Sequence, residues 1–328
     1  MSKSKIVVIG GGTGIPVILK SLRQENIDLS AIVTVADDGG SSGRLRSAID
    51  IAPPGDLRNV LIAMSDMPKF YADILQYRFD SSDGELAGHP LGNLIIAAIG
   101  EMQGSTYEAI QTLARFFHVK GNVYPSSDTP LTLHAVFRDG HEVEGESKIT
   151  DYDDLIHHVY LTETNTGKSP RASKKVVQSI MEADTIVLGP GSLFTSILPN
   201  IVIPEIAEAL LKTPARIVYV CNIMTQRGET EHFSDADHVR VIHEHLGTRV
   251  IDTVLVNSAE VPEEYMNSNK FDEYLVQVVH DFKALQEEEV NIISNDFLQL
   301  VNGGAFHDGD AIALEIMGIS AQHERREV

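Results

Sequence analysis

The stretch IVVIGGGTGIPVILKSL, Ile6–Leu22, decides the fold of this chain. A short apolar run leads into a cluster of glycines, and apolar residues at helical spacing follow. The next apolar run, LSAIVTVADD (29–38), is typical of a second buried strand. A strand, a helix and a strand in this order predict parallel pairing with a right-handed crossover.

The same arrangement recurs in the second half of the chain. VLGPGSLFTSILPN, Val187–Asn200, predicts a strand, a glycine-rich turn and the start of a helix. Helical and strand-like segments continue to alternate up to VIDTVLVNS (250–258). This alternation is typical of a Rossmann-like, doubly wound α/β fold with a mostly parallel sheet. We expect residues 1–328 to form a single large α/β domain.

Residues 121–160 differ from this pattern. They alternate between polar and apolar side chains, contain several β-branched residues and turn at Asp139-Gly140. We expect a small antiparallel β insertion or edge element within the large domain, because the stretch is too short to bury a core of its own.

The charge and composition limit the partners of the protein. The 328 residues carry a formal net charge of -21, and so acidic a surface repels nucleic acid. We expect no membrane span, because no run of about eighteen apolar residues occurs. We expect no secretory signal in the N-terminal residues, and the single cysteine, Cys221, excludes an internal disulfide, so we expect a cytoplasmic protein. The many surface helices expected of this fold lead us to expect a homo-oligomer.

The first glycine turn is a candidate phosphate site. Gly11, Gly12, Thr13 and Gly14 would let a ligand approach the backbone closely at the N-terminus of a helix. The G-x-G-x-x-G dinucleotide fingerprint is not met, because Ile15 stands at its sixth position. A nicotinamide oxidoreductase is therefore a hypothesis that rests on this turn alone. The structural alternative is a tight turn packed against a neighbouring strand.

The second glycine turn repeats this logic. Gly189, Pro190, Gly191 and Ser192 would close the site from the other side, although Ser192 would also serve as a helix cap alone. The turn is neither a P-loop nor a nucleophile elbow, since the residues that define those motifs are missing. Two such turns at one edge of a sheet suit a ligand with more than one anionic or sugar part, such as a UDP-sugar or another diphosphate nucleotide.

A third glycine-rich stretch, VADDGGSSGRLR (35–46), predicts a mobile, hydrogen-bond-rich loop after the second strand. Asp37 and Asp38 are candidates to bind a sugar hydroxyl or Mg²⁺. Ser41, Ser42 and Arg44 are candidates to bind the sugar or phosphate of a ligand. An ordinary Asp-Gly turn is the alternative.

Three further polar turns add candidate ligand-binding residues. They are Arg58 and Asn59 in PPGDLRNV, His89 and Asn93 in GHPLGNLI, and Asn222 and Thr225 in CNIMTQRGET. Arg58 would contact a phosphate or else pair with an acid. No catalytic residue is assigned; the candidates are Asp38 for metal binding and His89 for proton transfer. We expect His238, His243 and His245, which lack a metal-binding spacing, to lie at the surface.

Six motifs in this order resemble one family. They are GGGTG, TVADDGGSSGRLR, PPGDLRN, GHPLGNL, LGPGSLFTS and NIMTQRGET. Together they are similar to the YvcK proteins, also called gluconeogenesis factors, within the YvcK/CofD superfamily. The resemblance runs from about Lys5 to Asn257 and covers little of the remaining C-terminal residues.

The resemblance implies a ligand site at the strand ends of a Rossmann-like fold. The implied ligand is a UDP-sugar such as UDP-N-acetylglucosamine, bound by a regulator that acts in cell shape and cell-wall precursor supply during gluconeogenic growth. The CofD branch is instead a Mg²⁺-dependent transferase, which moves a phospholactyl group from a nucleotide-linked donor to a deazaflavin alcohol. The Gly-Gly-Ser-Ser-Gly-Arg stretch after Asp38 is of the YvcK type, so we favour the regulator and keep the transferase as the alternative.

Overall fold

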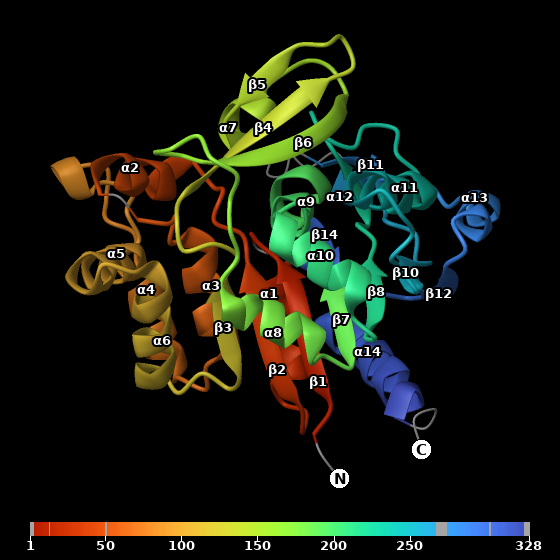
Figure 1. Ribbon diagram of the computed structural model, residues 1–328, viewed down its shortest axis with the longest axis horizontal. Coiled ribbons are helices and arrows are strands. Elements are labelled where there is room, and N and C mark those ends of the chain that lie inside the picture. Colours follow the sequence, from red (N-terminus) through yellow and green to blue (C-terminus); the bar gives the residue numbers. More distant parts are fainter. Residues whose placement is uncertain (1–2, 13, 50, 267–273, 302, 325–328) are drawn as a thin grey trace.

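Seven parallel strands form the central sheet. The computed structural model describes residues 3–12, 14–49, 51–266, 274–301 and 303–324. In these residues the strand order is β12-β10-β8-β7-β1-β2-β3, and every neighbouring pair is parallel (Figure 1). The strands are β1 (Lys5–Gly10), β2 (Asp28–Val33), β3 (Asn122–Pro125), β7 (Thr185–Leu188), β8 (Arg216–Val220), β10 (Thr253–Asn257) and β12 (Asn291–Asn295). The predicted α/β class with a mostly parallel sheet is confirmed.

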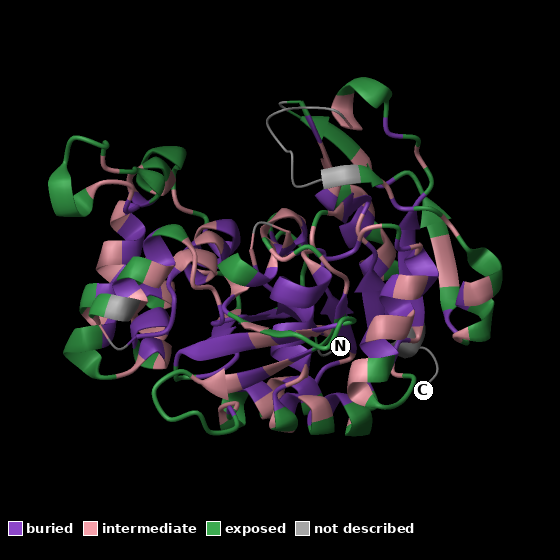
Figure 2. Ribbon diagram, turned by 90° about the horizontal axis from the view of Figure 1, so that it is seen from above, coloured by how far each residue is buried: buried purple, intermediate pink, exposed green. Residues whose placement is uncertain are grey.

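Helices cover both faces of this sheet. α1 (Ile15–Leu22) and α3 (Gly55–Met64) pack together on one face, and α8 (Lys174–Met181) and α10 (Pro204–Lys212) pack together on the other. All residues of β7 and β10 are buried, which explains their continuous apolar sequences. Figure 2 shows the buried residues concentrated in the central strands and the exposed ones in the outer helices and loops.

The winding of the chain reverses between β1 and β7. From β1 the chain proceeds to β2 and β3 on one side, and it then returns to β7 on the other side of β1. Ligands of doubly wound sheets bind at such a reversal, beside the carboxyl ends of the strands. Both glycine turns follow these two strands, so the fold brings them to the same place.

A group of short helices extends the fold beyond β3. α5 and α6 pack against each other, and α6 also contacts β3. Ser105 caps α6 by accepting a hydrogen bond from the Glu108 N–H. The elements of this group are α2 (Gly40–Ala48), α4 (Lys69–Gln76), the 3₁₀ turn η1 (Gly84–Leu86), α5 (Leu91–Gln103) and α6 (Thr106–Phe116).

The stretch 121–160 divides between two sheets. Its first strand, β3, extends the central parallel sheet by pairing with β2. The remainder forms an antiparallel sheet of β4 (Leu131–Phe137), β5 (Glu142–Glu144) and β6 (Ile156–Glu163), with the short helix α7 (Glu146–Ile149). This sheet stands over the carboxyl edge of the central sheet (Figure 1). The antiparallel part is therefore shorter at its start than we expected, while the single-domain organisation stays a prediction.

The last described elements complete the edge of the central sheet and the wall around its carboxyl ends. α14 (Gly309–Glu324) packs against α1, and a Cβ on Gly309 would lie 2.4 Å from the Val17 carbonyl oxygen, so the two backbones nearly touch. Two small antiparallel sheets lie near the strand ends. One pairs β9 (Met224–Gln226) with β11 (Tyr274–Gln277), and the other is a hairpin of β13 (Leu298–Val301) and β14 (Gly304–His307).

Helix α11 (Asp235–Leu246) lies closer to the core than we expected. His238 and His243 are buried, so the prediction of a surface position was wrong for both. His238 Nδ1 is 2.8 Å from the Ser234 carbonyl oxygen, and His243 Nδ1 is 2.9 Å from the Glu288 carboxylate. α11 contacts α9 (Leu198–Ile201) and α13 (Phe282–Glu287). The two remaining described helical segments are the short π-helix η2 (Leu193–Ile197) and α12 (Glu263–Met266).

The helices described here include none that is long and apolar enough to cross a membrane alone. One pair, Leu193–Ile201 with Pro204–Lys212, meets the criterion only jointly and is bent by 77°.

Candidate functional site

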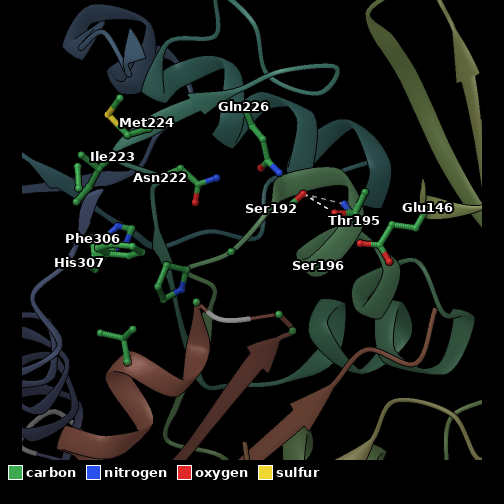
Figure 3. A pocket seen from close by; sticks show the side chains of 17 residues that line it. Glu146, Ser192, Thr195, Ser196, Asn222, Ile223, Met224, Gln226, Phe306 and His307 are labelled. Atoms are coloured by element: carbon green, nitrogen blue, oxygen red, sulfur yellow. Dashed lines mark hydrogen bonds between the residues drawn. The ribbon is translucent and has the colours of Figure 1, made fainter. Parts of the chain in front are cut away.

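An open cavity of about 220 Å³ lies at the reversal between β1 and β7. Both glycine turns, the end of β8, the antiparallel insertion and the β13–β14 hairpin contribute to its walls (Figure 3). The described lining residues are Gly11, Gly12, Gly14, Val17, Glu146, Pro190, Gly191, Ser192, Thr195, Ser196, Asn222, Ile223, Met224, Gln226, Ala305, Phe306 and His307.

The two glycine turns pack directly on each other. A Cβ on Gly14 would lie 2.2 Å from the Pro190 carbonyl oxygen, which is far inside van der Waals contact. Glycine at this position is therefore required by the close approach of the two backbones. Gly12 has φ +62°, in the region that favours glycine. Thr13, a candidate from the sequence, lies outside the described residues.

The carboxyl group of Asp56, at the start of α3, contacts the first glycine turn. The Gly12 N–H donates a hydrogen bond to Asp56, which we did not single out as a site residue. Burial, with a further contribution from the nearby Asp37, raises the pKa of Asp56 to about 7. A backbone N–H that a Rossmann-type site would offer to phosphate is thus occupied by an acidic side chain.

The second turn carries a carboxylate as well. Ser192 caps the following helical turn by accepting the Thr195 N–H at 3.1 Å, and it donates its own hydroxyl to Glu229. Glu229 also accepts from the Phe194 N–H at 3.3 Å and the Thr195 hydroxyl at 3.2 Å. Glu229 is fully buried, so these hydrogen bonds hold its carboxyl group at the start of this helical segment.

Four lining side chains keep their polar groups open to the cavity. Ser196, Asn222, Gln226 and Glu146 form no side-chain hydrogen bond with any residue that the structure describes. In Figure 3, Asn222 and Gln226 lie between Glu146 on one side and Phe306 and His307 on the other.

Glu146 is the only acidic side chain among the described lining residues. Burial raises its pKa well above the ordinary value, and the carboxylates of Asp37, Asp56, Glu229 and Asp38 raise it further. Its position depends on the insertion, because Asp38 accepts the Ser147 N–H at 3.0 Å and so fixes the start of α7.

The β13–β14 hairpin supplies the remaining wall. Burial lowers the pKa of His307 to about 4, so its imidazole is neutral at neutral pH. Its Nε2 lies 3.0 Å from the carbonyl oxygen of Cys221 and donates to it, which ties the hairpin to the end of β8. The sequence analysis missed this hairpin and Glu146, because neither lies in a glycine turn or in a motif with known chemistry.

Four of the other candidate residues meet in a second polar cluster between α2, α3 and α5. Ser41 Oγ is 2.8 Å from His89 Nδ1 and accepts from Asn93 Nδ2 at 3.0 Å. Arg58 Nη1 donates to Asn93 Oδ1 at 2.6 Å, and all four side chains are buried. Burial and the cations Arg44 and Arg78 lower the pKa of His89. We call these four residues the α2–α5 network; none of them lines the cavity.

The prediction of a loop at 35–46 was wrong from residue 40 onward, because Gly40–Ala48 forms helix α2. Glycine and serine are poor helix formers, but tertiary contacts override propensity here. Ser41 and Ser42 are buried, and the Ser42 hydroxyl accepts the Gly55 N–H at 3.2 Å. A Cβ on Gly43 would lie 1.9 Å from the Asp38 carbonyl oxygen, so the helix packs on its own entry turn.

The remaining candidates are engaged elsewhere. Arg44 is exposed and donates to the Ala87 carbonyl at 2.6 Å, and Asn59 accepts from Arg58 Nη2 at 3.0 Å. Thr225 donates its hydroxyl to the Val276 carbonyl at 3.2 Å. Gly189 precedes the lining residues of the second turn without lining the cavity itself.

The Asp37–Asp38 pair does not build a metal site on its own. Asp37 accepts the Gly39 N–H at 2.8 Å, and Asp38 holds α7. Within the described parts of the chain, no group of three or more His, Cys, Asp or Glu side chains is placed to hold a metal ion. Mg²⁺ is commonly bound by one or two carboxylates together with ligand phosphates, so these residues would fit it only as part of such a complex.

Comparison with known proteins identifies the family. The CofD family, described as 2-phospho-L-lactate transferase CofD, matches residues 6–298. The chain belongs to this family. A Lactococcus lactis subsp. lactis protein named "Putative gluconeogenesis factor" is 80% identical over 326 residues, covering 99% of this chain and 100% of that protein. A Listeria monocytogenes protein named "Gluconeogenesis factor" is 46% identical over 312 residues, covering 95% of this chain and 94% of that protein.

A solved structure agrees with the fold of this CofD-family member. The crystal structure of a Bacillus halodurans protein superimposes with a TM-score of 0.92 at 38% sequence identity. The match covers 96% of this chain and 100% of that chain. The resemblance to the YvcK/CofD superfamily is confirmed, and it extends through the C-terminal elements that the six motifs did not cover.

Proposed function

We propose that this CofD-family protein is a cytoplasmic regulator that binds a UDP-sugar of the UDP-N-acetylglucosamine type. It would link carbon metabolism to cell-wall precursor supply and cell shape. The names of its relatives support a role of the gluconeogenesis-factor, YvcK type. The family model supports a nucleotide-related ligand.

The observation that carries the proposal is the polar cavity at the winding reversal. It combines close backbone approach at two glycine turns with open hydroxyl and amide groups at Ser196, Asn222 and Gln226. Such groups suit a ligand rich in hydroxyl and carbonyl groups, as a sugar or a nucleoside is. The two candidates for catalysis, Asp38 and His89, are not among the lining residues, which favours binding over turnover.

Calorimetric titration of the full-length protein tests the proposal. The ligands are UDP-N-acetylglucosamine, UDP-glucose, GDP and NAD, each with and without Mg²⁺. We expect metal-independent binding of a UDP-sugar in the micromolar range, with the nucleotide recovered intact. Binding of GDP that requires Mg²⁺, with no binding of either UDP-sugar, would contradict it.

The match to a transferase family motivates a second candidate, a Mg²⁺-dependent transferase that uses a nucleotide-linked donor. Here Asp37 and Asp38 would hold the metal together with the donor phosphates. Turnover of a nucleotide-diphospho donor that is lost in Asp38→Asn, but kept in the exposed control Asp139→Asn, would favour the transferase over the regulator.

A further inference from the structure

We propose that the cavity holds the uncharged, hydroxyl-bearing end of its ligand, and that Glu146 selects this end. The inference rests on the proposed function and adds an orientation to it. The sugar of the nucleotide sugar faces the two glycine turns, and the diphosphate lies away from them.

The first step of the argument is that, at each glycine turn, a carboxyl group of the protein already accepts one backbone N–H group. Asp56 accepts the Gly12 N–H, and Glu229 accepts the Phe194 N–H together with the hydroxyls of Ser192 and Thr195. Helix N-termini bind phosphate because their free N–H groups carry partial positive charge. At each turn a carboxyl group of the chain itself occupies one of these N–H groups, so the turn offers fewer of them to a ligand phosphate.

The second step is the balance of charge around the cavity. The described lining residues include Glu146 but neither lysine nor arginine. Arginines of the surrounding elements donate elsewhere: Arg46 Nη2 to the Thr132 hydroxyl at 2.8 Å, and Arg58 into the α2–α5 network. Phosphate needs cations or free N–H groups for tight binding. A diphosphate inside this cavity would therefore find no cationic side chain among these residues, and the Glu146 carboxyl would not supply one.

The third step is what the open groups can recognise. Ser196, Asn222 and Gln226 offer hydroxyl and amide groups that both donate and accept hydrogen bonds. The Glu146 carboxyl accepts hydrogen bonds from hydroxyls. Sugar hydroxyls donate and accept, and an N-acetyl group matches a side-chain amide. The set of groups is complementary to an uncharged sugar and unfavourable to a phosphate.

The sign of one mutational effect separates the two orientations. If the sugar lies in the cavity, Glu146→Ala removes hydrogen bonds to it, and we expect the affinity for UDP-N-acetylglucosamine to fall about ten-fold. The affinity for UDP, which lacks the sugar, should stay the same or rise. If the diphosphate lies in the cavity, Glu146→Ala changes the affinities for UDP and for UDP-N-acetylglucosamine in the same direction, because both ligands contain it.

Calorimetry on the full-length wild type, Glu146→Ala and Glu146→Gln measures these affinities. Glu144→Ala, an exposed acid two residues away on β5, is the matched control and should change neither. Because Glu146 forms no hydrogen bond with a described side chain, we expect Glu146→Ala and Glu146→Gln to fold, and thermal melting verifies this. If either fails to fold, Glu146→Asp, which shortens the side chain by one methylene, takes its place. Unchanged or tighter binding of the UDP-sugar to Glu146→Ala overturns this inference and leaves the proposed function standing. If the wild type binds no UDP-sugar, the proposed function fails and the inference fails with it.

Discussion

The cavity and the α2–α5 network are built from the same kinds of residue but differ in how their polar groups are used. In the network, Ser41, Arg58, His89 and Asn93 bond to one another and are buried. In the cavity, Ser196, Asn222 and Gln226 have no hydrogen-bonding side-chain partner among the described residues. A buried polar group must be paired for the fold to be stable, whereas an unpaired one at a cavity is available to a ligand. The difference separates residues that hold the site from residues that would touch its occupant.

The largest expected effect is on the network. Arg58→Ala leaves the Asn93 side chain buried without its donor, so we expect the free energy of unfolding to fall by about 3 kcal/mol. Urea denaturation measures this, with the exposed Arg115→Ala as a control expected to stay within about 0.5 kcal/mol. UDP-sugar affinity of the folded variant should change less than about two-fold. A ten-fold loss of affinity in a fully folded Arg58→Ala protein would contradict the distinction between the α2–α5 network and the cavity.

Next comes the contact between the two glycine turns. In Gly14→Ala the new methyl group meets the Pro190 carbonyl oxygen, so the turns must separate. We expect a loss of about 2 kcal/mol in unfolding free energy, as for other overpacked sites, and weaker ligand binding. Gly318→Ala is the control, because no heavy atom lies within 4 Å of the new Cβ and the helix should gain about 0.5 to 1 kcal/mol. Equal behaviour of the two variants would show that the turns do not need their close approach.

A smaller effect should depend on pH. The pKa of Asp56 is raised to about 7 in the folded state, chiefly by burial, so folding favours its protonated form. Stability from this group is greatest below the ordinary Asp pKa and is lost as the pH rises toward 7. Asp56→Asn, which can still accept the Gly12 N–H, should therefore gain melting temperature relative to the wild type as the pH rises from 4 to 8. Parallel melting curves across this range would argue against an acid with a raised pKa at the first turn.

The smallest effect on stability is expected inside the cavity. Ser196→Ala removes a hydroxyl that bonds to no described residue, so the free energy of unfolding should stay within about 0.5 kcal/mol. The affinity for a UDP-sugar should fall about five-fold, because a ligand hydroxyl loses its partner. Ser81→Ala, on a distant exposed turn, should alter neither quantity. A destabilised Ser196→Ala protein with unchanged affinity would place Ser196 with the network instead.

The strand and helix order could be predicted because buried strands have a recognisable apolar sequence. Continuous apolar runs such as KIVVIG and TIVL specify strands covered on both faces, and glycines mark the turns after them. Helix α2 was not predictable from composition, since its glycines and serines are held by tertiary contacts. The split of 121–160 between two sheets depends on a pairing with β2, which lies far away in sequence.

The site was predicted where it lies in the glycine turns and at Asn222, which follows β8. Gly11, Gly12, Gly14 and Ser192 carry a local signal, and the fold places them at the cavity. Glu146 and His307 arrive from the insertion and from a late hairpin, and nothing in their flanking residues indicates where the fold puts them. Asp56 and Glu229 are ordinary acids in sequence, and only the fold shows that they occupy the N–H groups we expected phosphate to use.

The packing of α14 on α1 has a consequence for how the protein folds during its synthesis. The ribosome makes the first glycine turn early, yet Ala305–His307 and the helix that covers α1 emerge after all the other lining residues. Domains fold as units as their segments become available during synthesis. A chain interrupted before residue 305 would display both turns without the wall that Ala305–His307 supply, so the cavity would be complete only in chains whose translation had passed that point.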